Sequence, residues 1–319
     1  MNSATTLPAR LKVSAIQQEA EGVVSMELCS EDDAPLPVWT PGAHIEIELA
    51  DKLVRHYSLC GTPADAQRWR IAVLREDDSR GGSELIHDSF RPGRVVSASW
   101  PRNNFALVDA DRYLFVAGGI GITPILPMVH EVARCGKPWT LLYGGRTRGS
   151  MAFVEELSTV PGGDLYVLPH DEHGLLDLDR FLGSPEPQTA VYCCGPGSLI
   201  DAVELRCASW PTGALHLERF TPRELPALGP DGQFEVQLAG TGTTLRVQAD
   251  RTLLEVLEDA GIEIDNSCRA GICGTCEVRV LGGIPEHHDD VLSDSERESR
   301  EIILPCVSRS RSAVLVVDL

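Results

Sequence analysis

The chain has 319 residues, and its hydrophobic content of 43% and charged content of 24% are typical of a globular protein with two or three domains. Because the formal net charge is −19, we expect neither nucleic acid nor an anionic membrane surface as a partner. The N-terminus lacks the basic and apolar regions of a signal peptide, and no apolar run has the length of a membrane span. With ten cysteines and no secretion signal, we expect a cytoplasmic protein with reduced thiols, and we take it to be a monomer.

The first third of the chain predicts short antiparallel strands. Residues 10–16, 23–28 and 44–49 alternate apolar and polar side chains, and turn signals such as Pro41-Gly42 lie between them. Several such strands at short intervals favour an antiparallel β-barrel.

A further strand, residues 55–59, carries side chains that suit a nucleotide-like cofactor. Arg55 can bind a phosphate, Tyr57 can cover an aromatic ring, and the Ser58 hydroxyl can bond a ring nitrogen. Arg80-Gly81-Gly82-Ser83 then precedes a helical pattern. We expect Ser83 to be the N-cap of that helix, whose open amides favour a phosphate. Each motif alone is more often plain strand surface or loop.

From about residue 109 strands and helices alternate, which predicts a parallel α/β sheet. Its strands are expected at residues 113–117, 139–143, 164–168, 190–193 and 214–218. Gly118-Gly119-Ile120-Gly121 follows the first strand, and we expect Thr123 to cap a helix that runs from Pro124 to residue 135. The third glycine of the dinucleotide fingerprint is missing, but a glycine turn at a helix start still suits a pyrophosphate. A purely structural turn is the alternative.

Two later features support a nicotinamide site. Cys193-Cys194-Gly195-Pro196 ends a strand, and ligands of open parallel sheets bind outside the carboxyl ends of the strands, although Cys194 could be a plain buried thiol. Asp171 follows another strand and favours NADH, because a carboxylate bonds ribose hydroxyls and repels a 2′-phosphate. Arg146 and Arg148 could accept that phosphate, and Asp171 could equally be a solvated loop residue.

The C-terminal part contains a metal-binding pattern. Cys268, Cys273 and Cys276 are spaced C-x4-C-x2-C, and with Cys306 they match the ligands of plant-type [2Fe–2S] ferredoxins. A structural zinc site usually takes two C-x2-C pairs, and only one is present. A hairpin, a capped helix and late strands surround the loop, which predicts an α+β domain of the β-grasp type. The acidic stretch from Glu286 to Asp290 is expected to be a solvated face or a docking surface for a basic partner.

Together, Arg55-His56-Tyr57-Ser58, Arg80-Gly-Gly-Ser83, the glycine turn with Thr123-Pro124, Cys193-Cys-Gly-Pro196 and the four cysteines resemble the phthalate dioxygenase reductase family over nearly the whole chain. The resemblance implies a flavin-binding barrel domain at 1–106, an NAD-binding α/β domain at 107–224, a linker at 225–232 and a [2Fe–2S] ferredoxin domain at 233–319. It also implies FMN in preference to FAD.

The site residues that the resemblance implies fall into three groups. The flavin is expected at Arg55, His56, Tyr57, Ser58, Gly81, Gly82 and Ser83, with Phe220 near its ring unless that residue is core packing. NADH is expected at Gly119, Gly121, Thr123, Asp171, Cys194 and Gly195, and the cluster at Cys268, Cys273, Cys276 and Cys306. Ser58 and Cys194 are expected beside the reacting atoms.

The resemblance further implies an electron path from NADH through FMN and the [2Fe–2S] cluster to a Rieske-type oxygenase component. Two other functions stay open: a reductase that serves a cytochrome P450, and a non-catalytic metal-binding or sensor module on a reductase scaffold.

Overall fold

The computed structural model describes residues 8–51, 53–77, 79, 81–223 and 232–319. Arg80 of the predicted flavin motif and residues 225–231 of the predicted linker lie outside these ranges. The chain divides into two compact units, Met1–Arg219 and Phe220–Leu319, which we describe separately. In the described ranges, we find no helix with the length and apolar character needed to traverse a lipid bilayer.

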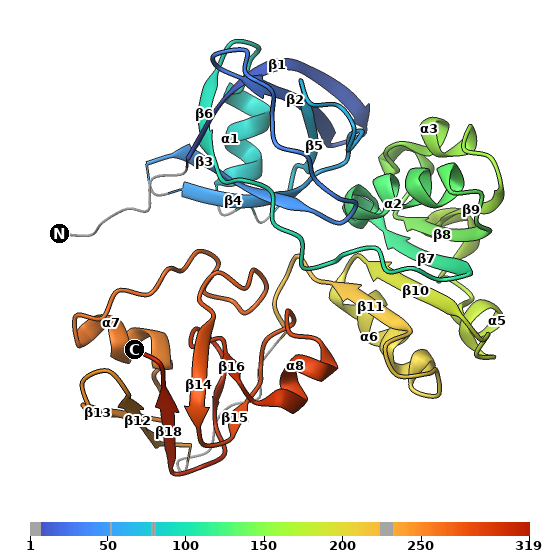
Figure 1. Ribbon diagram of the computed structural model, residues 1–319. Coiled ribbons are helices and arrows are strands. Elements are labelled where there is room, and N and C mark those ends of the chain that lie inside the picture. Colours follow the sequence, from blue (N-terminus) through green and yellow to red (C-terminus); the bar gives the residue numbers. More distant parts are fainter. Residues whose placement is uncertain (1–7, 52, 78, 80, 224–231) are drawn as a thin grey trace. The chain divides into compact units, whose positions relative to one another are not determined.

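The first unit begins with a six-stranded antiparallel sheet in the order β4-β3-β6-β1-β2-β5 (Figure 1). The edge strands β4 and β5 meet through a bridge between Leu59 and Ile71, so the sheet closes into the predicted barrel. Ile86 of helix α1 and Phe90, which follows the helix, pack into the barrel core. The elements are β1 (Ala9–Ala20), β2 (Val23–Ser30), β3 (His44–Ala50), β4 (Leu53–Ser58), β5 (Trp69–Leu74), α1 (Gly82–Ser89) and β6 (Val95–Ala98).

The second half of this unit is the predicted parallel sheet, with strand order β11-β10-β7-β8-β9. All five expected strands are confirmed within one or two residues. The elements are β7 (Arg112–Gly118), η1 (Gly119–Gly121), α2 (Ile122–Arg134), β8 (Trp139–Gly145), η2 (Arg148–Ser150), α3 (Val154–Ser158), β9 (Gly163–Pro169), α4 (His170–His173), α5 (Leu178–Leu182), β10 (Thr189–Cys194), α6 (Gly197–Cys207) and β11 (Leu215–Glu218).

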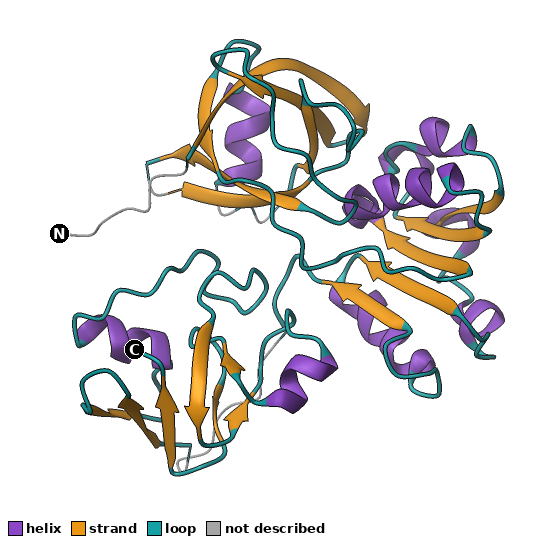
Figure 2. Cartoon of the chain, in the orientation of Figure 1, coloured by secondary structure: helices purple, strands orange, loops and turns teal. Residues whose placement is uncertain are grey.

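Helices cover both faces of the parallel sheet (Figure 2). Alternate residues of β7 divide between two apolar clusters: Phe115 packs with α2, and Val116 packs with α5 and α6. Cys60 and Ala72 of the barrel half belong to the same cluster as α2. The barrel and the parallel sheet therefore share buried apolar contacts.

The second unit is a five-stranded sheet with the order β13-β12-β18-β14-β16, in which only β12 and β18 are parallel. The predicted hairpin and helix are confirmed, and Thr252 and Glu255 form a capping box at the helix start. The elements are β12 (Phe234–Leu238), β13 (Thr244–Val247), α7 (Leu253–Asp259), β14 (Val278–Gly282), β15 (Pro285–Glu286), α8 (Asp294–Ser299), β16 (Ile302–Ile303), β17 (Arg309–Ser310) and β18 (Val314–Val317).

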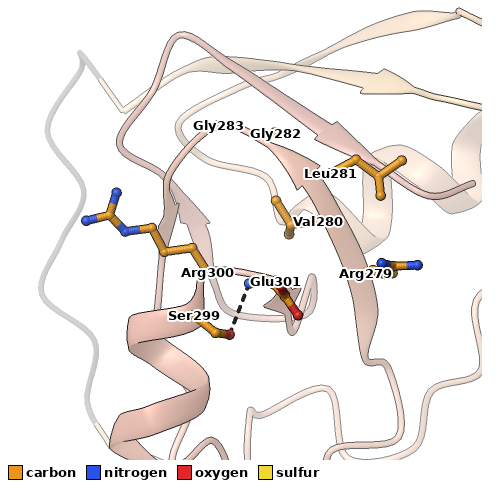
Figure 3. A pocket seen from close by; sticks show the side chains of 8 residues that line it. All are labelled: Arg279, Val280, Leu281, Gly282, Gly283, Ser299, Arg300 and Glu301. Atoms are coloured by element: carbon orange, nitrogen blue, oxygen red, sulfur yellow. Dashed lines mark hydrogen bonds between the residues drawn. The ribbon is translucent and has the colours of Figure 1, made fainter.

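A shallow pocket of about 330 Å³ lies between β14 and the C-terminal end of α8 (Figure 3). Arg279 and Arg300 line it, and the amide of Glu301 donates a hydrogen bond to the Ser299 hydroxyl beside it. The residues that line this pocket include none of the predicted site residues.

Candidate functional site

Strand β4 presents the predicted flavin residues on two faces. Its register with β3 pairs Tyr57 with Ile45 and Arg55 with Ile47, so Arg55 and Tyr57 share the face of the barrel core. A Cβ atom added to Gly82 would lie 2.9 Å from the Cγ and Nε atoms of Arg55. The structure therefore brings the strand motif and the glycine motif into direct contact.

The start of α1 differs from the prediction that Ser83 is its N-cap. Gly81 is the N-cap, with a φ of 85° that L-residues rarely adopt, and the helix begins at Gly82. The Ser83 hydroxyl instead accepts a hydrogen bond from the Glu76 amide at 3.2 Å and donates one to Ser79 at 3.0 Å. The first helical amides have no intrahelical acceptor, so together with the Arg55 guanidinium they are donors that fit a phosphate group.

The other face of β4 carries His56 and Ser58. The ring of His56 lies 5.7 Å from that of His44, and burial lowers the pKa of both imidazoles to about 4. Ser58 is buried, and its hydroxyl donates a 3.4 Å hydrogen bond to Oε2 of Glu218 at the end of β11. Burial raises the pKa of Glu218 to about 8.

Sequence reasoning did not assign Glu218 a functional role. The residue lies two positions before Phe220, and nothing in the spacing indicates that it reaches a hydroxyl 160 residues earlier in the chain. The sequence feature that could have indicated its role is its position as the last residue of a parallel strand, because ligands of such sheets bind at the carboxyl ends of the strands.

The glycine turn after β7 and the Cys-Gly-Pro segment after β10 lie against each other. Because β7 and β10 are neighbours while β8 lies on the other side of β7, this is the point where the strand order reverses. A Cβ atom on Gly121 would lie 2.3 Å from the carbonyl oxygen of Cys194 and 2.7 Å from the amide nitrogen of Gly195. Only glycine permits this approach, which brings the predicted pyrophosphate turn and the predicted nicotinamide segment together at the point where open α/β sheets have their ligand crevice.

Thr123 is not the N-cap of α2, contrary to the prediction. A 3-10 turn over Gly119–Gly121 leads directly into the helix, which begins at Ile122 with Gly121 as its N-cap. The buried Thr123 hydroxyl donates a 3.0 Å hydrogen bond back to the Ile120 carbonyl. Gly136 ends the helix in the left-handed conformation, since it has a φ of 68° and its amide bonds the Ala133 carbonyl at 2.9 Å.

The side chain of Cys194 is fully buried, and burial raises the pKa of its thiol well above the ordinary value. A protonated thiol is a poor nucleophile, so the thiol fits a role as a wall of the site better than a covalent one.

Asp171 lies in α4 directly after β9, and its amide donates a 3.2 Å hydrogen bond to the carbonyl of Arg146 in the loop after β8. The carboxylate that would favour NADH and an arginine that could accept a 2′-phosphate are therefore neighbours. Arg146 is 91% exposed and lies 3.9 Å from Asp77.

Phe220 is 39% exposed and is the first residue of the second unit. The roles of Asp171 and Phe220 stay predictions.

In the part of the chain that the structure describes, no three His, Cys, Asp or Glu side chains surround one point as the ligands of a single metal ion would. The cluster thiols instead form two pairs: Cys268 and Cys273 lie within hydrogen-bond reach of each other, as do Cys276 and Cys306. Within the first pair, the hydrogen bond from the Cys268 thiol lowers the pKa of Cys273, toward the thiolate that ligates a metal, and raises the pKa of Cys268. Two thiol pairs fit the two irons of a [2Fe–2S] cluster.

Two glycines of the cluster loop have backbone conformations that L-residues rarely adopt, since Gly271 and Gly274 have φ values of 71° and 73°. At Gly271 the loop also lies close to its neighbours, because a Cβ there would be 2.6 Å from a methyl group of Val307. The amide of Asp290 also bonds the Gly271 carbonyl at 2.9 Å.

The acidic stretch before the fourth ligand is only partly the solvated face that the sequence predicts. The Asp289 side chain is fully buried, where it accepts hydrogen bonds from the Leu292 amide, Arg297 and the Ser308 hydroxyl. Asp290 pairs with Arg223 at 2.6 Å. The Asp289 carboxylate thus joins the acidic stretch to Arg297 on α8 and to Ser308 after the fourth cysteine, because a buried charge is retained only where donors compensate it.

Comparison with protein families identifies the nucleotide-binding domain and the iron–sulfur domain. Residues 115–205 match the family model described as an oxidoreductase NAD-binding domain, and residues 236–311 match the 2Fe-2S iron-sulfur cluster binding domain. These matches and the fold define the class of the protein as a pyridine-nucleotide oxidoreductase with its own [2Fe–2S] domain.

Near full-length relatives narrow this class. The chain is 39% identical to the reductase subunit of tert-butanol monooxygenase / tert-amyl alcohol desaturase from Aquincola tertiaricarbonis, over 97% of this chain and 95% of that protein. It is 36% identical to phthalate dioxygenase reductase from Burkholderia cepacia, over 97% of each chain. The chain belongs to the phthalate dioxygenase reductase family and carries electrons from NADH through a flavin to the [2Fe–2S] cluster, for an oxygenase system.

Solved structures agree with this assignment. The crystal structure of phthalate dioxygenase reductase superposes with a TM-score of 0.68 at 36% identity, and the match covers 97% of both chains. An intact type IV self-sufficient cytochrome P450 monooxygenase superposes with a TM-score of 0.92 at 39% identity over 98% of this chain. Our chain spans only 41% of that longer polypeptide.

Proposed function

We propose that this protein is the reductase component of a Rieske-type oxygenase, with FMN as its flavin and NADH as its electron donor. The observation that carries the proposal is the end-to-end match to reductase subunits, among them those of phthalate 4,5-dioxygenase and vanillate O-demethylase from Pseudomonas putida, each of which the match covers by 96%. A cytochrome P450 is the second candidate acceptor, because the matched part of the self-sufficient P450 is of the same fold.

The flavin phosphate is proposed to lie at the start of α1. The amides of Gly82 and Ser83 would donate to its oxygens, and the Arg55 guanidinium, packed against Gly82, would supply the compensating charge. Tyr57 and His56 would border the ring. One phosphate at one helix start suits FMN, the flavin that has a single phosphate.

The reacting atoms are proposed to lie between the end of β4 and the crevice at β7 and β10. When bound, NADH supplies a hydride, the flavin takes up the two electrons and releases them singly, and the cluster carries one electron at a time. The Ser58 hydroxyl would bond the flavin ring near N5, and Cys194 and Gly195 would bound the nicotinamide. A Glu218 carboxyl with a pKa of about 8 stays largely protonated at neutral pH, so it can hold a proton beside Ser58.

The nucleotide is proposed to extend along the carboxyl edge of the sheet. Gly119, Gly121 and Thr123 lie at the start of α2, where backbone amides favour a pyrophosphate, and Asp171 would bond the adenosine ribose. We also propose that the protein works in the cytoplasm, where NADH is available. Each of its ten cysteines is free of a disulfide.

Reconstitution tests the partner. Purified reductase, NADH and either a Rieske oxygenase component or a cytochrome P450 from the same source are combined, and substrate oxidation is followed together with NADH consumption. Product formation with the Rieske component alone supports the proposal, and product formation with the P450 alone supports the second candidate. Cys276→Ser is the matched control, because it retains the flavin and nucleotide sites but lacks one cluster ligand.

A further inference from the structure

An ion pair joins the barrel half of the first unit to its parallel-sheet half. Arg70 lies on β5, and Glu156 lies on α3. The Nη2 atom of Arg70 is 3.0 Å from both carboxylate oxygens of Glu156, and the two side chains are only 24% and 34% exposed. This partial burial shields the pair from solvent screening, so it differs from an ordinary surface salt bridge.

Arg70 also fixes the end of the strand that carries Ser58. Its Nε and Nη2 atoms donate hydrogen bonds of 3.2 and 2.8 Å to the carbonyl oxygen of Cys60, two residues after Ser58. The guanidinium lies over the ring of Phe153, 5.0 Å from its centroid. A Cβ on Gly61 would lie 3.1 Å from the Cβ of Arg70, so a small residue there lets Arg70 lie close to the strand end.

Glu156 extends the contact to the helix of the glycine turn. The Nε2 atom of His130 on α2 lies 3.1 Å from Oε1 of Glu156, and the same α2 begins directly after Gly119–Gly121. Burial alone would raise the pKa of Glu156, but hydrogen bonds from His130 and Arg70 lower it to about 2. The carboxylate is therefore ionised at neutral pH and retains both partners.

We propose that Arg70, Glu156 and His130 form a latch that sets the distance between the flavin strand and the nucleotide turn. The inference rests on the proposed function, because it assigns the hydride acceptor to the Ser58 side and the hydride donor to the Gly121 side. The latch residues touch neither cofactor and are positioning residues, which act by holding the flavin strand and the nucleotide turn in place. Hydride transfer depends steeply on geometry, and a misplacement of about 1 Å can slow a reaction by about 10²-fold.

Anaerobic stopped-flow reduction of the flavin by NADH tests the latch in the full-length holoprotein. Arg70→Gln, Glu156→Gln and the double variant are compared with wild type, using both NADH and NADH deuterated at C4. Arg68→Gln is the matched control, because Arg68 lies two residues from Arg70 but forms exposed ion pairs with Glu27 and Asp65, which both belong to the barrel half. Flavin content, iron content and the NADH dissociation constant are measured for each protein.

We expect each single variant to slow flavin reduction at saturating NADH by about tenfold, with an altered deuterium isotope effect and unchanged flavin and iron content. The double variant should be no slower than either single one, because the two residues act through each other. Arg70→Lys keeps the charge and should recover part of the rate. If Arg70→Gln does not fold, Glu156→Gln breaks the same latch from the other side.

Wild-type rates in both single variants would overturn the latch, as would equal slowing in Arg68→Gln. Slower reduction with an unchanged isotope effect would also overturn it, because it would indicate a general loss of stability without a change in transfer geometry. A wild-type protein that cannot reduce its flavin with NADH would refute the proposed function instead, independently of the latch.

Discussion

Replacing Gly121 with alanine tests the crevice between the glycine turn and the Cys-Gly-Pro segment. The added Cβ would lie 2.3 Å from the Cys194 carbonyl oxygen, whereas ordinary van der Waals contact begins near 3.4 Å, so the two backbones must separate by about 1 Å. Since both neighbours are backbone atoms, no side chain can rotate away to relieve the contact. Overpacking of this kind typically lowers the free energy of unfolding by about 1–3 kcal/mol.

The functional effect should exceed the effect on stability. A separation of about 1 Å between the pyrophosphate turn and the nicotinamide segment is expected to slow NADH-dependent flavin reduction by up to about 10²-fold. The assay is anaerobic stopped-flow, with thermal unfolding and flavin content measured on the same samples. Gly282→Ala is the control, because neither Gly121 nor Gly282 has a positive φ and a Cβ on Gly282 would meet only the Val316 side chain, at an ordinary contact distance of 3.5 Å. Wild-type kinetics in Gly121→Ala would refute the assignment of this crevice to the nicotinamide.

Four other predictions concern the remaining sites. Cys276→Ser should abolish NADH-dependent reduction of cytochrome c but retain reduction of ferricyanide, because it removes one thiol of the pair with Cys306; undiminished cytochrome c reduction would contradict the ligand assignment. Arg55→Ala should weaken flavin retention, seen as a lower flavin-to-protein ratio after gel filtration, and full occupancy would count against the phosphate site. Asp171→Ala should raise the use of NADPH relative to NADH, measured as the ratio of the two kcat/KM values; an unchanged ratio would remove its role. Burial raises the pKa of Glu218 from its ordinary 4.5 to about 8, so the folded protein holds this proton more tightly than the unfolded chain. The free energy of unfolding should therefore fall as the pH rises from 4.5 to about 8. Glu218→Gln should flatten this part of the pH profile of thermal unfolding, and an unaltered profile would refute the shift.

The fold was largely predictable because hydrophobic periodicity and turn residues agree along the chain. Strands β2, β3 and β7 to β12 lie within two residues of their expected positions. Strand β1 runs to Ala20, well past the predicted end at residue 16, because register shifts let the polar residues 17–19 continue the pairing with β2.

Both wrong helix caps have the same physical cause. Ser83 and Thr123 are good N-caps by residue type, but a glycine two residues before each of them is the N-cap, so each helix begins two residues earlier than predicted. Their hydroxyls then bond local groups. At these two helices the glycine turn therefore shifts the cap toward the N-terminus, which a rule based on residue preference does not anticipate.

The residues that sequence analysis missed depend on contacts between distant segments. Glu218 meets Ser58 only because the barrel and the parallel sheet pack together, and Asp289 is buried because Arg297 and Ser308 compensate its charge. The four predicted cluster cysteines, in contrast, form a pattern that the sequence shows directly, because three of them lie in one loop with a spacing that few other sites share.

The position of β18 in the second unit has a consequence for maturation. This strand joins the β12–β13 hairpin to the β14–β16 pair, yet it follows all four ligand cysteines in the sequence. A chain truncated between Cys306 and Val314 would contain all four ligand cysteines but would lack the strand that joins the two halves of the sheet. We therefore expect stable retention of the cluster only after the chain has been synthesised past β18.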